Sequence, residues 1–175
     1  MKKNDFWHKT LLLGAITGVV MALLQSLTVG LKLQFAGLGL LMFLINAALI
    51  WFFVGRYVRT CGDRGCSYAD ALGFCGGLAL FSAIVYSLLL TFMVRVVLSD
   101  VYMEQLDTVI SQLSSIYGNT GTITPERMTG LLSNPIALFM SNLFGMVFRG
   151  VFIGLVVSAI VKRAPVAPGN ADRIG

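Results

Sequence analysis

Charged residues are scarce in this sequence of 175 residues. They make up 12% of the chain, whereas hydrophobic residues make up 57%, and the mean hydropathy is +0.83. A soluble domain carries about 25% charged residues to cover its surface. The composition therefore excludes a water-soluble globule and indicates an integral membrane protein.

Histidine and cysteine are also rare. The chain has one histidine, His8, and three cysteines, Cys61, Cys66 and Cys75. No Ser-His-Asp arrangement, carboxylate pair or phosphate-binding loop can be assembled, so we expect a protein that is not an enzyme and has no cofactor. A zinc site needs four ligands, and His8 lies in a different segment from the cysteines, so we expect no metal and reduced thiols.

Four long apolar runs dominate the sequence. They cover residues 10–29, 35–54, about 71–98 and 136–161. A helical span needs about 20 mostly apolar residues, because a helix rises 1.5 Å per residue through about 30 Å of hydrocarbon. We therefore predict an all-α membrane protein whose four transmembrane helices form a bundle over residues 1–163. The polar tail 164–175 is expected to be disordered.

A secretory signal peptide is the competing interpretation of the first run, because Met1, Lys2 and Lys3 precede it. The run is long, and no cleavage site of the small-x-small type follows it. The first span is therefore expected to remain in the protein.

The orientation follows from the lysines and arginines that flank the runs. Three precede the first run, three lie between the second and third, and three follow the fourth. Such an excess marks the cytoplasmic side, so both termini are predicted to be cytoplasmic. The net charge of +5 is then a consequence of topology, and no nucleic-acid binding is expected.

The long segment 99–134 is expected on the outer, periplasmic side. Apolar residues recur in it at helical spacing, at Leu106, Val109, Leu113 and Ile116. This spacing predicts an amphipathic helix that continues the third span beyond the membrane. Thr124 and Pro125 predict the start of a second short helix that ends near Leu132. Together they would form a small outer helical hairpin.

Two short links predict local structure. The link from Gly30 to Gln34 favours a tight antiparallel hairpin of the first two spans. Ser67 and Asp70 precede the third run in the spacing of a helix cap, so we interpret Asp70 as a capping residue rather than a transport carboxylate.

Glycines recur at four-residue spacing in three of the runs. Such pairs let helix backbones approach closely in lipid, where association depends on packing. The six predicted packing positions are Gly14, Gly18, Gly73, Gly77, Gly150 and Gly154.

Arg149 lies at the middle of the fourth run. A charge at this depth costs about 2.5 kcal/mol or more, so such residues are usually buried, paired or functional. The first three runs contain no acid. Because helical side chains lean toward the N-terminus of their helix, we expect Arg149 to reach the level of Gln25 and Tyr86 rather than that of Asn46. These four residues are the candidate binding site.

The order of these features resembles a bacterial family called domain of unknown function 4199. The most specific pattern is Ser-Tyr-x-x-Ala-Leu-Gly, which is present here as residues 67–73. The resemblance implies a four-helix protein of the bacterial inner membrane with no assigned activity. It also implies, as a partner, a glycosyltransferase of the polyprenyl-phosphate type.

Two functional hypotheses follow. The first is an accessory or scaffold subunit in the membrane, which associates with another membrane protein or with itself. The second is a small oligomeric transporter or channel for an anionic solute, with the candidate binding residues along its path. A cavity that reaches Arg149 would favour the second hypothesis.

Overall fold

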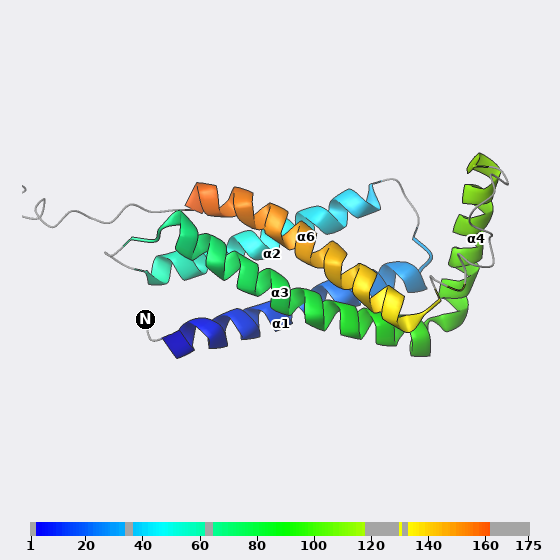
Figure 1. Cartoon of the computed structure of the whole chain (residues 1–175), viewed down its shortest axis with the longest axis horizontal. Helices are drawn as coiled ribbons and strands as arrows, with labels where there is room; N and C mark the ends of the chain where they lie inside the picture. The colour runs from blue at the N-terminus through cyan, green and yellow to red at the C-terminus, as the bar shows by residue number, and fades with distance from the viewer. Residues whose placement is uncertain (1–2, 34–36, 62–64, 118–129, 131–132, 162–175) are drawn as a thin grey trace, which may run out of the picture.

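The computed structural model is helical throughout the part that it describes, residues 3–33, 37–61, 65–117, 130 and 133–161 (Figure 1). In chain order the helices are α1 (Lys3–Gly30), α2 (Leu38–Thr60), α3 (Tyr68–Phe92), a π-helical segment η2 (Met93–Val97), α4 (Ser99–Tyr117) and α6 (Pro135–Val161). Four of the helices are long and apolar enough to cross a membrane, namely α1, α2, α3 with η2, and α6. The four predicted spans are therefore present.

Helix α2 is displaced relative to the predicted run 35–54. It begins at Leu38 and ends at Thr60, so it includes Arg56 and Arg59, which are exposed. Long arginine side chains can bury their stems while the charged group extends to the lipid headgroups. A helix can therefore continue beyond the charge-free run from which a span is predicted.

Helix α3 is the centre of the bundle. α1 packs along one side of α3, α6 packs along another, and α2 packs mainly against α6. The predicted tight hairpin of the first two spans is therefore wrong, because α1 and α2 make few contacts with each other. The link is short, but packing against α3 decides the neighbours of α1.

Glycines explain the close approach of α1 to α3. A Cβ atom built on Gly14 would lie 2.8 Å from the Phe81 Cβ, and one built on Gly18 would lie 2.6 Å from the Ser82 carbonyl oxygen. On α3, a Cβ built on Gly77 would lie 2.6 Å from the Thr10 methyl carbon. Any side chain at these positions would separate the two backbones.

The contact between α3 and α6 uses small residues in the same way. Cβ atoms built on Gly150 and Gly154 would lie 2.6 Å and 2.9 Å from the Cβ atoms of Ala79 and Cys75. Gly73 is different, because it is exposed and no atom lies within 4 Å of the position that its Cβ would take. Gly73 therefore does not take part in a close helix contact.

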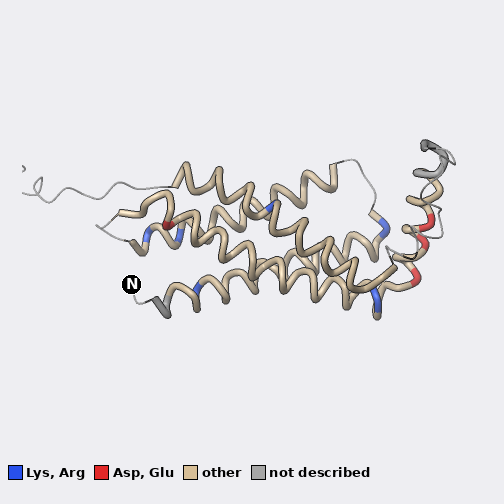
Figure 2. Tube along the Cα trace, in the orientation of Figure 1, with Lys and Arg blue, Asp and Glu red and all other residues tan. Residues whose placement is uncertain are grey.

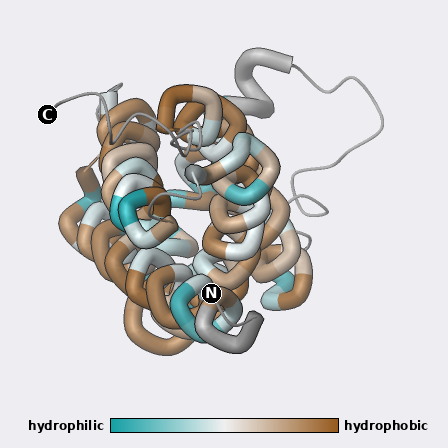
Figure 3. The backbone as a smooth tube through the Cα atoms, turned by 90° about the vertical axis from the view of Figure 1, so that its left-hand side faces the viewer, coloured by the Kyte–Doolittle hydropathy of each residue, from teal (hydrophilic) through white to brown (hydrophobic). Residues whose placement is uncertain are grey.

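The outer surface of the bundle is apolar. Figure 3, which views the bundle from the end at which the chain begins, shows hydrophobic residues on all of its helices. Phe144 and Phe148 of α6 are 69% and 78% exposed. Such a surface is unfavourable in water and suits the hydrocarbon of a bilayer.

Helix α4 contains the predicted amphipathic stretch, residues 106–116, but it does not continue the direction of α3. It crosses the end of the bundle (Figure 1) after the π-helical segment η2 and a break in the helix at Leu98. Leu106 and Ile110 of α4 are buried, whereas Val109, which was predicted on the apolar face, is exposed. The turn at Leu98 allows the buried residues to pack instead of extending away from the bundle.

Two polar contacts join α4 to the end of α1. The Lys32 Nζ pairs with the Glu104 Oε2 at 2.6 Å, and the Gln105 Nε2 donates to the Val29 carbonyl oxygen at 3.2 Å. Figure 2 shows the acidic residues of α4 gathered at this end of the bundle. We call this end the α4 end and the other the N-terminal end. The second helix of the predicted hairpin and the tail 164–175 lie outside the described residues.

The start of α3 confirms the predicted cap. The Asp70 backbone N–H donates to the Ser67 Oγ at 3.1 Å, and the Ser67 backbone N–H donates to the Asp70 Oδ2 at 3.3 Å. This reciprocal capping box satisfies backbone donors that the first turn leaves unpaired. Asp70 therefore has a structural role at the helix terminus.

Candidate functional site

Arg149 lies near the middle of α6, fourteen residues after Pro135 and twelve before Val161. At 1.5 Å per residue this places it about 21 Å from the α4 end of its helix. It is the only charged residue of α6 and is half-buried.

Arg149 lines a cavity of about 440 Å³ in the half of the bundle next to α4. Helices α1, α2, α3, α4 and α6 and the segment η2 all contribute residues to it. The polar lining residues are Gln25, Tyr86, Tyr102, Asn142 and Arg149, and the others are Val29, Leu38, Gly39, Met42, Leu90, Val94 and Leu138. A second cavity of about 70 Å³ shares Tyr86, Asn142 and Arg149 with the first.

The cavity brings together three of the four predicted binding residues, Gln25, Tyr86 and Arg149. They come from α1, α3 and α6, and all three are half-buried. The lean of Arg149 toward the start of α6 places it on the same cavity as Gln25 and Tyr86. Their common location agrees with the expectation from the depth of each residue in its run and from the lean of the Arg149 side chain.

The charge of Arg149 has no partner among the described residues. Arg149 makes no hydrogen bond or ion pair with them, although Gln25 and Tyr86 line the same cavity. No acidic residue of the described part of the chain lines either cavity. A guanidinium with five N–H donors therefore lines a space in which no described group accepts a hydrogen bond from it.

Asn46 does not reach this cavity. It is fully buried between α2 and α6, where its Nδ2 lies 3.8 Å from the Met146 Sδ. Its Oδ1 has no hydrogen-bond partner. Asn46 lies four residues, about one turn, beyond Met42 along α2, and its amide is in the packed interior. The prediction that Asn46 belongs to the binding site is not supported by its position.

Comparison with known proteins places the chain in a family. A model described as a protein of unknown function, DUF4199, matches residues 10–163. The chain belongs to the DUF4199 family. The matched region contains α2, α3, α4, α6 and all of α1 except its first seven residues. Every residue that lines the cavity lies within it. No curated protein and no solved structure matches the chain.

Two polar residues of the DUF4199 cavity were not predicted, Asn142 and Tyr102. Asn142 lies seven residues before Arg149, which is two helical turns on the same face, so the helical period could have identified it. Its Nδ2 donates to the Leu138 carbonyl oxygen at 2.9 Å. Tyr102 lies on α4, and burial raises the pKa of its hydroxyl, while Arg95 acts in the opposite direction. No sequence signal places Tyr102 of α4 on the cavity that α6 lines.

The cysteines of this DUF4199 protein are free thiols at and near the start of α3. Cys66 and Cys75 are buried, and Cys61 is half-buried. Burial raises the pKa of the Cys66 thiol to about 12, with further contributions from Cys61 and Asp70. Within the described residues no group of three or more potential metal ligands is found. The raised pKa keeps Cys66 protonated and unreactive at neutral pH.

Proposed function

We propose that this chain is a multi-pass membrane protein that binds an oxyanion at Arg149, in the cavity near α4. The observation that carries the proposal is the unpaired guanidinium on a cavity of about 440 Å³. A charge at the centre of a bilayer is costly unless it is compensated. An anion in the cavity would compensate it where the described part of the chain supplies no carboxylate.

The chemistry of the cavity favours an oxyanion such as a phosphate or a carboxylate. The planar guanidinium matches the two oxygens of such groups with parallel hydrogen bonds. Gln25, Tyr86 and Tyr102 line the same space and carry further N–H or O–H donors. The donors come from three helices besides α6, so they can surround an anion held by Arg149.

The oxyanion can belong to a free solute, to a lipid or to a partner protein. In an accessory subunit of a polyprenyl-phosphate glycosyltransferase, the phosphate of the lipid-linked sugar would have the required chemistry. In a transporter, the same site would bind a solute during passage. A cavity that reaches Arg149 is what the transporter hypothesis requires. Transporter sites are typically formed by interrupted helices, however, and α1, α2 and α6 are each continuous, whereas α3 alone is continued by the π-helical segment η2. The continuity of these three helices supports binding in an accessory subunit over transport.

The test is binding of inorganic phosphate to the purified protein and to Arg149→Met, which retains bulk and removes the charge. We expect phosphate to raise the thermal unfolding temperature of the wild-type protein and to lose this effect in the variant. Arg95→Met is the matched control, because Arg95 is an exposed arginine near the same end of the bundle. Arg149→Lys should retain part of the binding through its charge.

Two results would overturn the proposal. One is equal phosphate binding by wild-type protein and Arg149→Met. The other is loss of the fold in both Arg149→Met and Arg149→Lys, which would assign Arg149 a purely structural role. If phosphate fails but vesicles containing phosphatidylglycerol stabilise only the proteins with a cation at position 149, the oxyanion is a lipid headgroup.

A further inference from the structure

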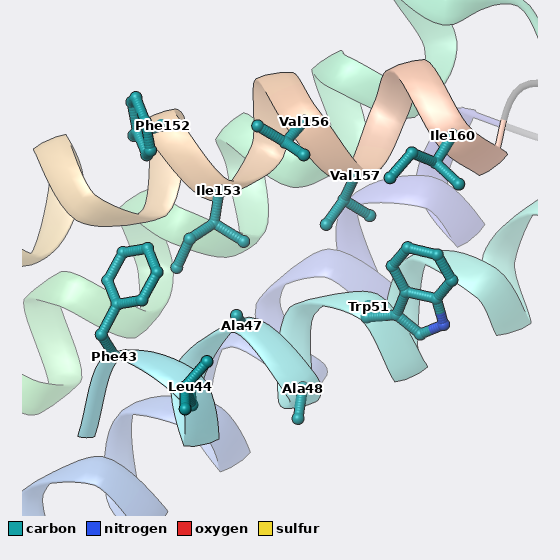
Figure 4. A pocket seen from close by; sticks show the side chains of 10 residues that line it. All are labelled: Phe43, Leu44, Ala47, Ala48, Trp51, Phe152, Ile153, Val156, Val157 and Ile160. Atoms are coloured by element: carbon teal, nitrogen blue, oxygen red, sulfur yellow. The ribbon is translucent and has the colours of Figure 1, made fainter. Parts of the chain in front are cut away.

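A second feature of the surface lies between α2 and α6, in the half of the bundle away from α4. It is an apolar groove of about 430 Å³. In Figure 4 Phe43 lies near Phe152 at one end of the groove, and Trp51 lies near Ile160 at the other. Trp51, Phe152 and Ile160 are each about half exposed, so the groove is open to the surroundings of the bundle.

The groove leads to a basic hollow at the N-terminal end. This hollow has a volume of about 310 Å³ and is lined by Trp51, Phe52, Gly55, Arg56 and Arg59. Trp51 lines both spaces. Groove and hollow are therefore adjacent, with the indole at their junction.

The sequence of α2 explains why the two spaces are aligned. Leu44, Ala48, Trp51, Gly55 and Arg59 recur at spacings of three and four residues, so they form one stripe along the helix. Ala48 and Gly55 keep the stripe shallow, and a Cβ built on Gly55 would meet no atom within 4 Å. The stripe is apolar over its first part and ends in an arginine.

The two arginines are available for a ligand. Arg56 and Arg59 are exposed and lie three residues apart, which makes them neighbours on the helix surface. Among the described residues the one ion pair joins Lys32 to Glu104, at the opposite end of the bundle. Both guanidinium groups can therefore contact a single phosphate.

We propose that this surface is a specific site for an anionic phospholipid. The acyl chain lies in the groove between α2 and α6, and the phosphate contacts Arg56 and Arg59. The groove runs along the helices, which is the direction of lipid tails in a bilayer, and it ends where Trp51 can occupy the membrane interface. One lipid molecule supplies both the apolar and the anionic part that the surface requires.

A second copy of the chain fits this surface less well. A symmetric contact through the groove would bring the arginines of two copies toward one another, and like charges in an interface oppose association. The lipid site is also independent of the cavity at Arg149, with which it shares no residue.

Native mass spectrometry of the protein in mild detergent tests the proposal. The probes are phosphatidylglycerol and phosphatidylcholine with identical acyl chains. We expect phosphatidylglycerol to be retained preferentially, and the double variant Arg56→Gln/Arg59→Gln to retain it about thirtyfold less. The control variant Lys9→Gln/Arg95→Gln also removes two positive charges, but from exposed positions outside the site. It should retain phosphatidylglycerol as the wild-type protein does. Arg149→Met should also do so.

Groove variants test the acyl chain. Ala48→Phe fills the groove at an exposed position and should reduce retention of phosphatidylglycerol, whereas Ala159→Phe, exposed on α6 outside the groove, should not. If Arg56→Gln/Arg59→Gln and Lys9→Gln/Arg95→Gln lost phosphatidylglycerol equally, the lipid would be held by general attraction to positive charge, and the proposed site would be wrong. If the wild-type protein were a dimer and Ala48→Phe abolished the dimer, a second copy of the chain would cover this surface. That result would also overturn the lipid site.

Discussion

The two halves of the bundle are packed differently. In the half at the N-terminal end, Ile50, Val54, Phe74 and Leu78 are at most 1% exposed. Phe74 stacks on Tyr57 with ring centroids 4.1 Å apart. In the half next to α4, the buried cluster is small and is based on Met21, Met42, Ala83 and Met146. The cavity of about 440 Å³ lies in this second half.

This difference shows where polar chemistry is tolerated. The core cluster of the first half consists of apolar residues and cysteines. The open spaces of this half, the groove and the basic hollow, lie at the surface of the bundle. The methionine-based cluster in the second half is adaptable, because unbranched thioether side chains fill irregular space. Arg149 lies beside this cluster, where neighbouring side chains can adjust around a bound anion.

The largest effect is expected from removing one leucine in each half of α3. Leu78 is fully buried in the packed half, and Leu90 lines the cavity. Leu78→Ala should cost about 4 kcal/mol, because it creates an empty space that the surrounding helices cannot fill. Leu90→Ala should cost about 2 kcal/mol, because it enlarges an existing cavity. Unfolding free energies in detergent measure both, and equal costs would refute the contrast between the halves.

A smaller effect is expected from substituting the glycines in the contact between α1 and α3. Gly18→Ala should destabilise the bundle by about 2 kcal/mol, because its Cβ would overlap the Ser82 carbonyl oxygen. Gly73→Ala is the matched control, since its Cβ meets no atom and alanine favours a helix by up to about 1 kcal/mol. Thermal unfolding midpoints should therefore move in opposite directions. A shift of the same sign in both variants would contradict the assigned contact.

The smallest effect on stability is expected from single cysteine substitutions at the two ends of the bundle. Labelling of these cysteines determines which end faces outward. Thr60 and Thr108 are both exposed, and each donates to a backbone carbonyl of its own helix. In a Cys61→Ser background, an impermeant maleimide should label Thr108→Cys in intact cells and spare Thr60→Cys until the cells are opened. The reverse pattern would show that the predicted orientation is wrong.

The native cysteines cannot replace these introduced ones. Burial raises the pKa of the Cys66 thiol to about 12, so very little of it is thiolate at neutral pH. Cys66 would therefore resist a maleimide on either side of the membrane. Its labelling should become fast only on unfolding, which denatured protein at the same pH will show.

Composition and hydrophobic run length were sufficient to predict the four membrane-length helices. Each helix must satisfy its own backbone in lipid, so a charge-free run of about 20 residues has one stable conformation. The Ser67 cap was predicted for a similar reason, since its partners lie within one turn. Helix direction and depth also placed Gln25, Tyr86 and Arg149 at a common level.

Only the tertiary structure decided which helices are neighbours. A short link does not show that α1 packs on α3 or that α2 packs on α6, because these contacts depend on small residues meeting across helices far apart in sequence. For the same reason the burial of Asn46 against Met146, the turn at Leu98 and the place of Tyr102 in the cavity could not be predicted. Which residues face lipid, a cavity or another helix is a property of the assembled bundle, since each membrane-length helix is predominantly apolar around its circumference.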